Sequence, residues 1–188
     1  MNRIGVRPLD AAAASPLSIV RSYPDLPMEE VFPRPGATKE PAVFAREAGR
    51  GRVVYFPFDL DRTFWDVLNA DHLVLLRNAV LWATNEPAPV SVKGPGVLDL
   101  AIWQQKNSMT VHLVNLTNPM MMKGPIREII PVLRQQVQIR IPGAQSITAV
   151  RLLVAGRAVP YRRTGETITL EVPSISLHEV IAVDFRTG

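Results

Sequence analysis

Two neighbouring stretches most strongly restrict what this chain can fold into: residues 51–65 (GRVVYFPFDLDRTFW) and residues 75–83 (LLRNAVLWA). The first opens with β-branched and aromatic residues, which favour a strand. The second carries apolar residues at helical spacing. They have the character of the last strand and last helix of an α/β domain. The roughly 50 residues before them hold no further strand–helix pair. We therefore expect an incomplete α/β segment at the tail of a longer protein.

A hairpin is expected just before the predicted helix. Residues 41–46 and 52–56 are two short runs of strand-forming residues, joined by a turn that contains Gly49 and Gly51. These glycines supply the positive φ values that a tight hairpin requires. The run 53–56 lacks polar alternation, which predicts a strand buried on both faces.

The region between the strand and the helix is predicted to be a loop, residues 57–66, with Asp71 as the N-cap of the helix. The helix is expected to present one apolar stripe to the sheet. This stripe consists of Leu73, Leu76, Val80 and Ala83.

Prolines indicate where the first domain ends. Residues 85–87 (NEP) stop the helix, and residues 87–90 (PAPV) form a short, stiff linker. We therefore divide the chain into an α/β segment at residues 1–86, the linker 87–90, and a second domain at residues 91–188.

The second domain shows strand periodicity throughout. Apolar residues alternate with polar ones in short runs separated by turn residues, which is typical of a β-sandwich of immunoglobulin-like size. The predicted strands are residues 97–103, 109–116, 136–141, 149–154, 166–172 and 179–185, with a weaker one at 158–161. The sequence Gly94-Pro95-Gly96 is predicted to be a turn and not a phosphate loop, because no strand-to-helix step surrounds it.

Composition excludes several classes of function. The chain has no cysteine, so it has no disulfide framework, thiolate metal site or cysteine nucleophile. The net charge of +4 is modest, and no run of Lys and Arg exceeds two residues, so nucleic-acid binding is not expected. No segment approaches the ~18 apolar residues of a membrane span. We expect a soluble segment with no membrane partner, and the sequence does not assign its compartment.

Three stretches carry a resemblance to a known family: residues 51–65, residues 75–83, and residues 111–119 (VHLVNLTNP). Over residues 18–185 the chain resembles the C-terminal region of bacterial glycoside hydrolases related to β-galactosidases. In that family a catalytic barrel is followed by a glutamine-amidotransferase-like domain, the β-galactosidase trimerisation domain, and then by a β-sandwich. The resemblance implies an α+β chain, with a partial α/β (flavodoxin-like) remnant followed by an all-β immunoglobulin-like sandwich.

The same resemblance transfers no catalytic residue to this chain. The barrel, which holds both catalytic carboxylates of the family, has no counterpart here, and neither does most of the amidotransferase-like domain. In the related β-galactosidases that domain is regarded as an assembly element without amidotransferase chemistry. We therefore expect no catalytic residue, cofactor or metal in this chain.

The best candidates for contact with a substrate or another domain are Asp59, Asp61, Arg62, Phe64 and Trp65. A glycosidase needs two carboxylates about 5–10 Å apart, and two Asp residues can also hold a hard cation. The commoner role of such acids is to solvate a loop or to pair with a neighbour such as Arg62. The aromatic pair could stack on a sugar face, but covering the helix or docking on missing domains is favoured.

Two further groups of residues are candidates for contacts or metal binding. Met120, Met121 and Met122 are flexible apolar side chains on an expected loop, and they indicate a contact with a partner or simple local packing. The histidines His72, His112 and His178 have no metal-ligand spacing. His112 is expected to face outward from the sandwich.

Three functional hypotheses follow. The leading one is a non-catalytic C-terminal structural and assembly segment, whose partners are a catalytic barrel domain or polypeptide and further copies of the chain. The second is a stand-alone carbohydrate-binding β-sandwich, which requires exposed aromatic residues on one sheet face. The candidates there are Trp103, Tyr161 and Phe185. The third is an autonomous hydrolase that uses Asp59 and Asp61.

Overall fold

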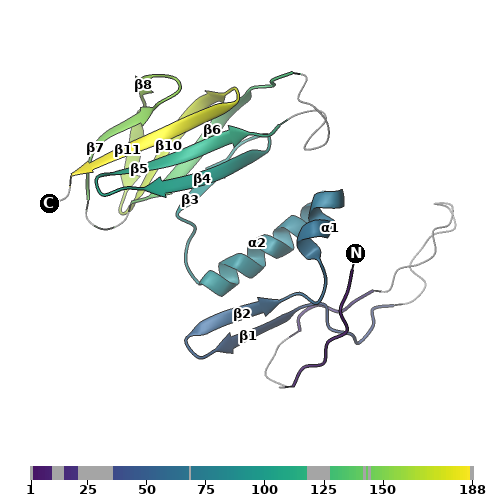
Figure 1. The fold of residues 1–188 in the computed structure, drawn as a ribbon. Helices are drawn as coiled ribbons and strands as arrows, with labels where there is room; N and C mark the ends of the chain where they lie inside the picture. The colour runs from purple at the N-terminus through teal and green to yellow at the C-terminus, as the bar shows by residue number, and fades with distance from the viewer. Residues whose placement is uncertain are drawn as a thin grey trace. The chain divides into compact units, whose positions relative to one another are not determined.

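The chain forms two compact units, Met1–Pro87 (unit 1) and Ala88–Gly188 (unit 2). The computed structural model describes residues 2–9, 15–20, 36–67, 69–117, 128–141, 143 and 145–186. Unit 1 combines a two-stranded sheet with two helices, and unit 2 consists of strands (Figure 1). The α+β class is therefore confirmed. Met120, Met121 and Met122 lie outside the described residues.

A hairpin of two antiparallel strands forms the sheet of unit 1. Strand β1 (Phe44–Ala48) pairs with β2 (Gly51–Tyr55), and Ala48 lies opposite Gly51 at the turn. The predicted hairpin is thus confirmed. Of the two turn glycines, Gly49 adopts a positive φ of 61°. Gly51 instead begins β2.

A helix follows the hairpin where a loop was predicted for residues 57–66. Helix α1 (Leu60–Val67) begins where the Asp59 carbonyl accepts hydrogen bonds from the Thr63 amide and hydroxyl, both at 2.9 Å. Two features of the sequence support it. Leu60 and Phe64 have the (i, i+4) spacing that places side chains on one helix face, and Asp61 carries negative charge in the first turn. The loop prediction was wrong because a single turn of apolar spacing gives a weak periodic signal.

Helix α2 (Ala70–Thr84) begins two residues earlier than predicted. Its N-cap is Asn69, whose side chain accepts a hydrogen bond from the Asp71 amide at 2.8 Å. Asp71 itself lies in the first turn. At the other end Asn85 adopts a left-handed conformation and stops the helix. A guanidinium joins α2 to the hairpin: Arg52 donates to Asn85 Oδ1 at 2.8 Å and lies over the Trp82 ring at 5.3 Å.

Unit 2 has two antiparallel sheets. Its strands are β3 (Val90–Lys93), β4 (Leu98–Gln104), β5 (Ser108–Asn115), β6 (Val132–Arg140), β7 (Ser146–Leu152), β8 (Arg157–Ala158), β9 (Tyr161–Thr164), β10 (Thr167–Ile175) and β11 (His178–Arg186). One sheet has the order β3-β6-β10-β9 and the other β4-β5-β11-β7-β8. Alternate residues of both sheets enclose one core, as in a β-sandwich. The predicted sandwich is confirmed.

Two details of unit 2 differ from the prediction. Strand β3 starts at Val90, the last residue of the expected linker, and pairs with β6. The weak strand at 158–161 is really two short strands, β8 and β9, in different sheets. Val159 and Pro160 separate them, and proline cannot donate a ladder hydrogen bond.

The helices of the described part are α1 and α2, and neither is long and apolar enough to cross a membrane.

Candidate functional site

Asp59 holds two parts of unit 1 together. Its Oδ1 accepts a hydrogen bond from the Asn2 amide at 2.7 Å, and its own amide donates to the Asn2 carbonyl at 3.3 Å. Its Oδ2 lies 3.7 Å from Arg62 Nε, which is the neighbour pairing expected from the sequence. The Asp59 carboxylate is therefore committed to structural contacts.

The other four candidates lie on α1. Asp61 and Arg62 are exposed, Phe64 is half-buried, and Trp65 is 48% exposed. Asp61 makes no side-chain hydrogen bond or ion pair with the described residues. Its partner in the predicted catalytic pair, Asp59, is directed toward the N-terminal segment. A glycosidase activity that survived Asp59→Asn and Asp61→Asn would exclude the pair as catalysts.

We expect Asp59→Ala to loosen the N-terminal segment. Ile4 donates to the Pro57 carbonyl at 2.8 Å beside the Asn2–Asp59 bond, so both contacts hold residues 2–9 against the rest of unit 1. Losing one such bond costs about 0.5–1.5 kcal/mol, which is up to about tenfold in a local opening equilibrium. Hydrogen exchange followed by NMR should show faster exchange of the Ile4 amide. Asp61→Ala is the matched control, and equal rates in both variants would refute the assignment.

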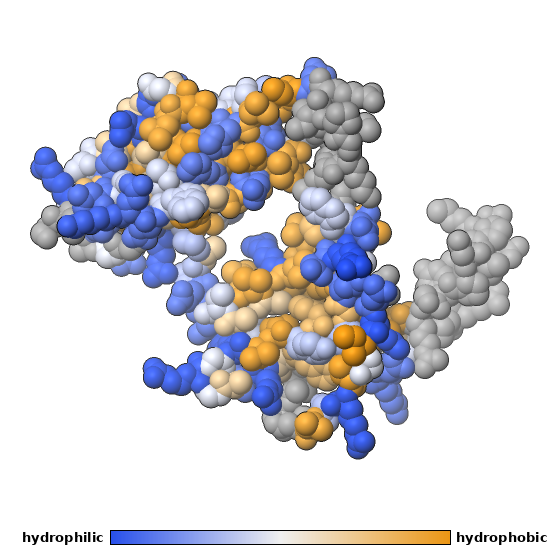
Figure 2. Space-filling view, in the orientation of Figure 1, coloured by the Kyte–Doolittle hydropathy of each residue, from blue (hydrophilic) through white to orange (hydrophobic). Residues whose placement is uncertain are grey.

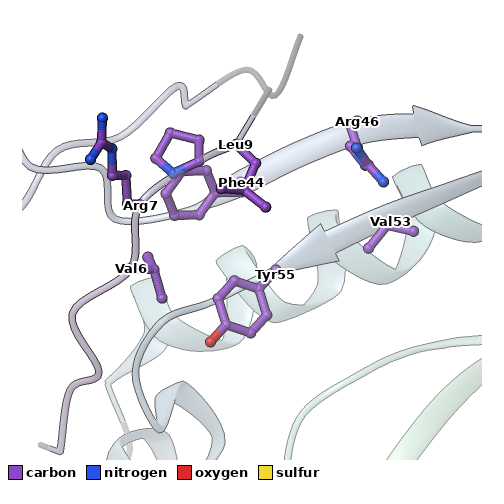
Figure 3. Close-up of a pocket in the computed structure, with 8 residues that line it drawn as sticks. Val6, Arg7, Leu9, Phe44, Arg46, Val53 and Tyr55 are labelled. Carbon is purple, nitrogen blue, oxygen red and sulfur yellow. The ribbon is translucent and has the colours of Figure 1, made fainter. Parts of the chain in front are cut away.

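The hairpin presents an open apolar face on the side away from α2. Arg52 of β2 contacts α2, so the alternate residues Val53 and Tyr55 point to the opposite face, where they pair with Arg46 and Phe44. The rings of Phe44 and Tyr55 are 6.4 Å apart. Figure 3 shows these side chains beside the N-terminal segment. They line a cavity of about 310 Å³ with Val6, Arg7, Pro8 and Leu9.

Val53 and Tyr55 are 47% and 44% exposed. The prediction that residues 53–56 are buried on both faces is therefore wrong for this chain taken alone.

Helix α2 is apolar on nearly all sides, yet none of its residues is buried. The side chains that approach the rest of unit 1 are His72, Leu75, Leu76, Ala79 and Ala83, which are half-buried. The prediction of the stripe that faces the sheet is only partly correct, because two of its members, Leu73 and Val80, are 51% and 59% exposed. Val74, Leu81 and Trp82 are also exposed, and the surface over α2 is largely apolar in Figure 2. A helix that is hydrophobic all round is normally buried all round.

The core of unit 1 is correspondingly small. Among its described residues the buried hydrophobic side chains are Val43 and Leu60, whereas seventeen buried side chains form the core cluster of unit 2. The ring atom Nδ1 of His72 is buried without a hydrogen-bond partner in the described part of the chain. Buried polar atoms are normally paired, so this atom is an exception among the described residues.

Two histidines meet on the outer face of unit 2, a contact that sequence spacing did not reveal. Nδ1 of His112 on β5 lies 3.2 Å from Nε2 of His178 on β11, and the rings stack at 5.3 Å. His112 faces away from the core, as predicted. The two imidazoles share one hydrogen bond. No group of three or more His, Cys, Asp or Glu residues within the described ranges is placed to hold a metal ion.

The aromatic residues of unit 2 do not gather on one sheet. Trp103 is 65% exposed on β4, Tyr161 is 40% exposed on β9 in the other sheet, and Phe185 is buried in the core. Sugar-binding platforms need aromatic rings that share a surface. This distribution gives the carbohydrate-binding hypothesis little support.

No protein-family model and no curated protein matches this chain. Solved structures do match it. Alpha-L-fucosidase isoenzyme 2 from Paenibacillus thiaminolyticus is similar with a TM-score of 0.61 and 16% sequence identity, over 81% of this chain. The fold of this chain is therefore similar to that of part of this fucosidase. The matched 81% of the chain is longer than either unit alone, so the similarity extends into both units.

Two further structures are β-galactosidases. One is Gan42B, a GH42 β-galactosidase, with a TM-score of 0.39, and the other is its catalytic mutant from G. stearothermophilus, with a TM-score of 0.38. Both are 18% identical over 80% of this chain. Scores this low support no structural argument. The chain spans 23% of the fucosidase and 16% of each β-galactosidase, so it corresponds to a minor part of those enzymes.

Proposed function

We propose that this chain is a non-catalytic C-terminal structural and assembly segment of a glycoside hydrolase-like, β-galactosidase-related protein. Unit 1 is the end of an amidotransferase-like α/β domain that packs against further elements of that domain and against a catalytic barrel. Unit 2 is the C-terminal sandwich. The likeness in fold to a fucosidase, of which the chain spans under a quarter, is compatible with this role.

One observation carries the proposal: α2 is apolar on most sides and has no buried residue. Its outward side chains Leu73, Val74 and Val80 are each about half exposed. Transfer of such side chains out of water contributes about 25 cal/mol per Å² of apolar surface. Burial of this surface against a partner would therefore stabilise their complex. The open face of the hairpin adds a second apolar surface on the opposite side of the sheet.

The DNA directly upstream of Met1 provides the first test. We expect it to encode, in the same direction, a barrel followed by strand–helix pairs. That polypeptide, coexpressed with this chain, should copurify with it. An upstream region without such a barrel, or two polypeptides that never associate, would contradict the proposal.

Val80→Lys tests the surface itself. Val80 is 59% exposed on α2, and Val154, at 62%, is exposed on unit 2. A charge at a contact centre should weaken binding of the upstream polypeptide by about 10- to 100-fold, because the ammonium would be buried without a partner. Val154→Lys makes the same change at a similar exposure outside the proposed contact, and should leave binding unchanged. Calorimetric titration of both variants separates these outcomes.

A further inference from the structure

The histidine pair of unit 2 lies on the outer face of the five-stranded sheet. His112 is on β5 and His178 is on β11, and both side chains are half-buried. In the register of these strands His112 is opposite Val180, and His178 is opposite Val114. The two histidines are therefore diagonal neighbours on one face of the sheet, where long side chains can reach each other.

The separation of two ring nitrogens fits a tetrahedral metal ion. His112 Nδ1 and His178 Nε2 are 3.2 Å apart. Zinc–imidazole bonds are about 2.0–2.1 Å long, so two such nitrogens at the tetrahedral angle are separated by about 3.3–3.4 Å. At the right angle of a square-planar copper site, bonds of the same length would separate them by about 2.8–3.0 Å. The observed spacing is closer to the requirement of Zn²⁺.

A threonine favours the form of His112 that a metal ligand needs. Thr110 Oγ1 lies 3.4 Å from His112 Nε2 and can accept a hydrogen bond from it. With the proton on Nε2, the Nδ1 lone pair is free, and metal-bound histidines normally have such a partner at their second nitrogen. In this tautomer the Nδ1 lone pair accepts the hydrogen bond from His178 Nε2. A metal ion would replace that hydrogen bond.

The rings need a modest rotation to bind an ion. In the hydrogen-bonded pair the two nitrogens face each other, whereas an ion with bonds of about 2.0–2.1 Å lies beside the line that joins them. Each lone pair must therefore turn by about 40° to point at the ion. Rotation of this size is accessible, because the χ2 angle of histidine has a broad range.

The charges on this face of the sheet also suit a cation. Asp99 of β4 is opposite Val114, so its exposed carboxylate is on the same face as the histidines. Arg151 of β7 is opposite Ala182 and is on this face too, but its guanidinium is paired with Asp184 at 2.8 Å. The nearby negative charge attracts a divalent ion, and the positive charge is already compensated.

We propose that His112 and His178 bind Zn²⁺ through Nδ1 and Nε2, respectively. Water completes the tetrahedral shell, because the half-buried rings leave the ion accessible to solvent. The His178 proton moves from Nε2 to Nδ1 through solvent, so the two neutral rings release no net proton. This site differs from the absence of a metal expected from the sequence, because only the register of β5 and β11 brings the ligands together. It is independent of the proposed function, since both ligands lie in unit 2.

Calorimetric titration of the untagged full-length chain with zinc chloride tests the site. We expect saturable binding of one ion per chain. Loss of a residue that only supports a ligand weakens metal binding about 10- to 100-fold, so His178→Ala, which removes a ligand itself, should weaken it at least about 100-fold. His72→Ala removes the third histidine of the chain and should leave the affinity unchanged. Thermal melting by circular dichroism checks that each variant is folded.

Thr110→Val tests the positioning role of the hydroxyl. It removes the partner of His112 Nε2 with little change in size, and we expect Zn²⁺ binding to weaken about tenfold. The ring protons should report the cause in NMR spectra of ¹⁵N-labelled protein. Without metal, His112 should carry its proton on Nε2 in the parent chain, and this tautomer should be less populated in Thr110→Val. An unchanged tautomer together with unchanged affinity would remove Thr110 from the site.

The same spectra test the whole proposal without any variant. On addition of Zn²⁺ the His178 proton should move from Nε2 to Nδ1, while His112 keeps its proton on Nε2. No saturable binding at millimolar Zn²⁺, or equal affinity in the parent chain and His178→Ala, would overturn the proposal. A His178 ring that keeps its Nε2 proton while Zn²⁺ binds would place the ion elsewhere and leave the pair as a hydrogen bond only. None of these results depends on whether an upstream polypeptide associates with unit 1.

Discussion

Replacing Glu179 by alanine is expected to lower the free energy of unfolding of unit 2 by about 2–4 kcal/mol, because it would leave one buried and two partly buried amide hydrogen bonds without their acceptor. Glu179 is 3% exposed on β11. Its carboxylate accepts hydrogen bonds from the amides of Val154, Ala155 and Val180 at 2.9, 3.1 and 2.8 Å. The buried Val180 amide left unpaired costs about 1–3 kcal/mol, whereas water can partly replace the acceptor at the other two amides. The bonds lost are also stronger than neutral ones, because their acceptor is charged.

Urea unfolding followed by circular dichroism measures this loss. Glu179→Gln keeps one acceptor oxygen but turns an amide group toward the backbone donors, so we expect a loss of about 1–2 kcal/mol. Glu171→Ala removes an exposed carboxylate from β10 and should stay within about 0.5 kcal/mol of the parent chain. If Glu179→Ala unfolded at the same urea concentration as Glu171→Ala, the three hydrogen bonds would have no role in stability.

The sandwich could be predicted from the sequence because its strands obey a simple rule. On β5 the apolar residues Met109, Val111 and Leu113 alternate with polar ones, and all three are buried. Period-two alternation reports directly which residues face a core. Strand bounds were less certain, since β6 begins at Val132, four residues before the predicted start. The stretch before Gln136 has weaker alternation, and pairing with β10 extends the strand.

The contacts between distant residues could not be predicted. His112 and His178 are 66 residues apart, and their meeting depends on the register between β5 and β11. The register between strands far apart in sequence cannot be read from alternation alone, because a shift by two residues keeps the same side chains in the core. Helix α1 was missed for a different reason. Eight residues hold two helical turns, which is too short for a clear period and fits a loop equally well.

In unit 1 the sequence predicted more burial than the structure contains. The run 53–56 has the composition of a doubly buried strand, but Val53 and Tyr55 are about half exposed. The same is true of Val80 in α2. Both elements formed where they were expected, so their local signals were interpreted correctly. The difference lies in how much of their surface is covered. Under the proposed function, further elements of the α/β domain and a catalytic barrel would cover these side chains.

Gly96→Ala is expected to destabilise unit 2 by about 2–5 kcal/mol through two separate effects. Gly96 has a φ of 86° in the turn between β3 and β4, a conformation that costs a residue with a side chain about 1–2 kcal/mol. An added Cβ would also collide with Val132 Cγ1 and Thr117 Oγ1. Overpacking of this kind costs about 1–3 kcal/mol.

A second glycine separates the two effects. Gly165 has a φ of 59°, and an added Cβ there would meet open space. Gly165→Ala should therefore show the backbone strain alone, about 1–2 kcal/mol. The difference between the two variants in urea unfolding gives the cost of the collision. Thr117 Oγ1 accepts the Val97 amide at 2.8 Å just before β4, so pushing Thr117 aside should also disturb the start of that strand. Equal losses in Gly96→Ala and Gly165→Ala would mean that Val132 and Thr117 move aside freely, and that this turn does not hold the start of β4 in place.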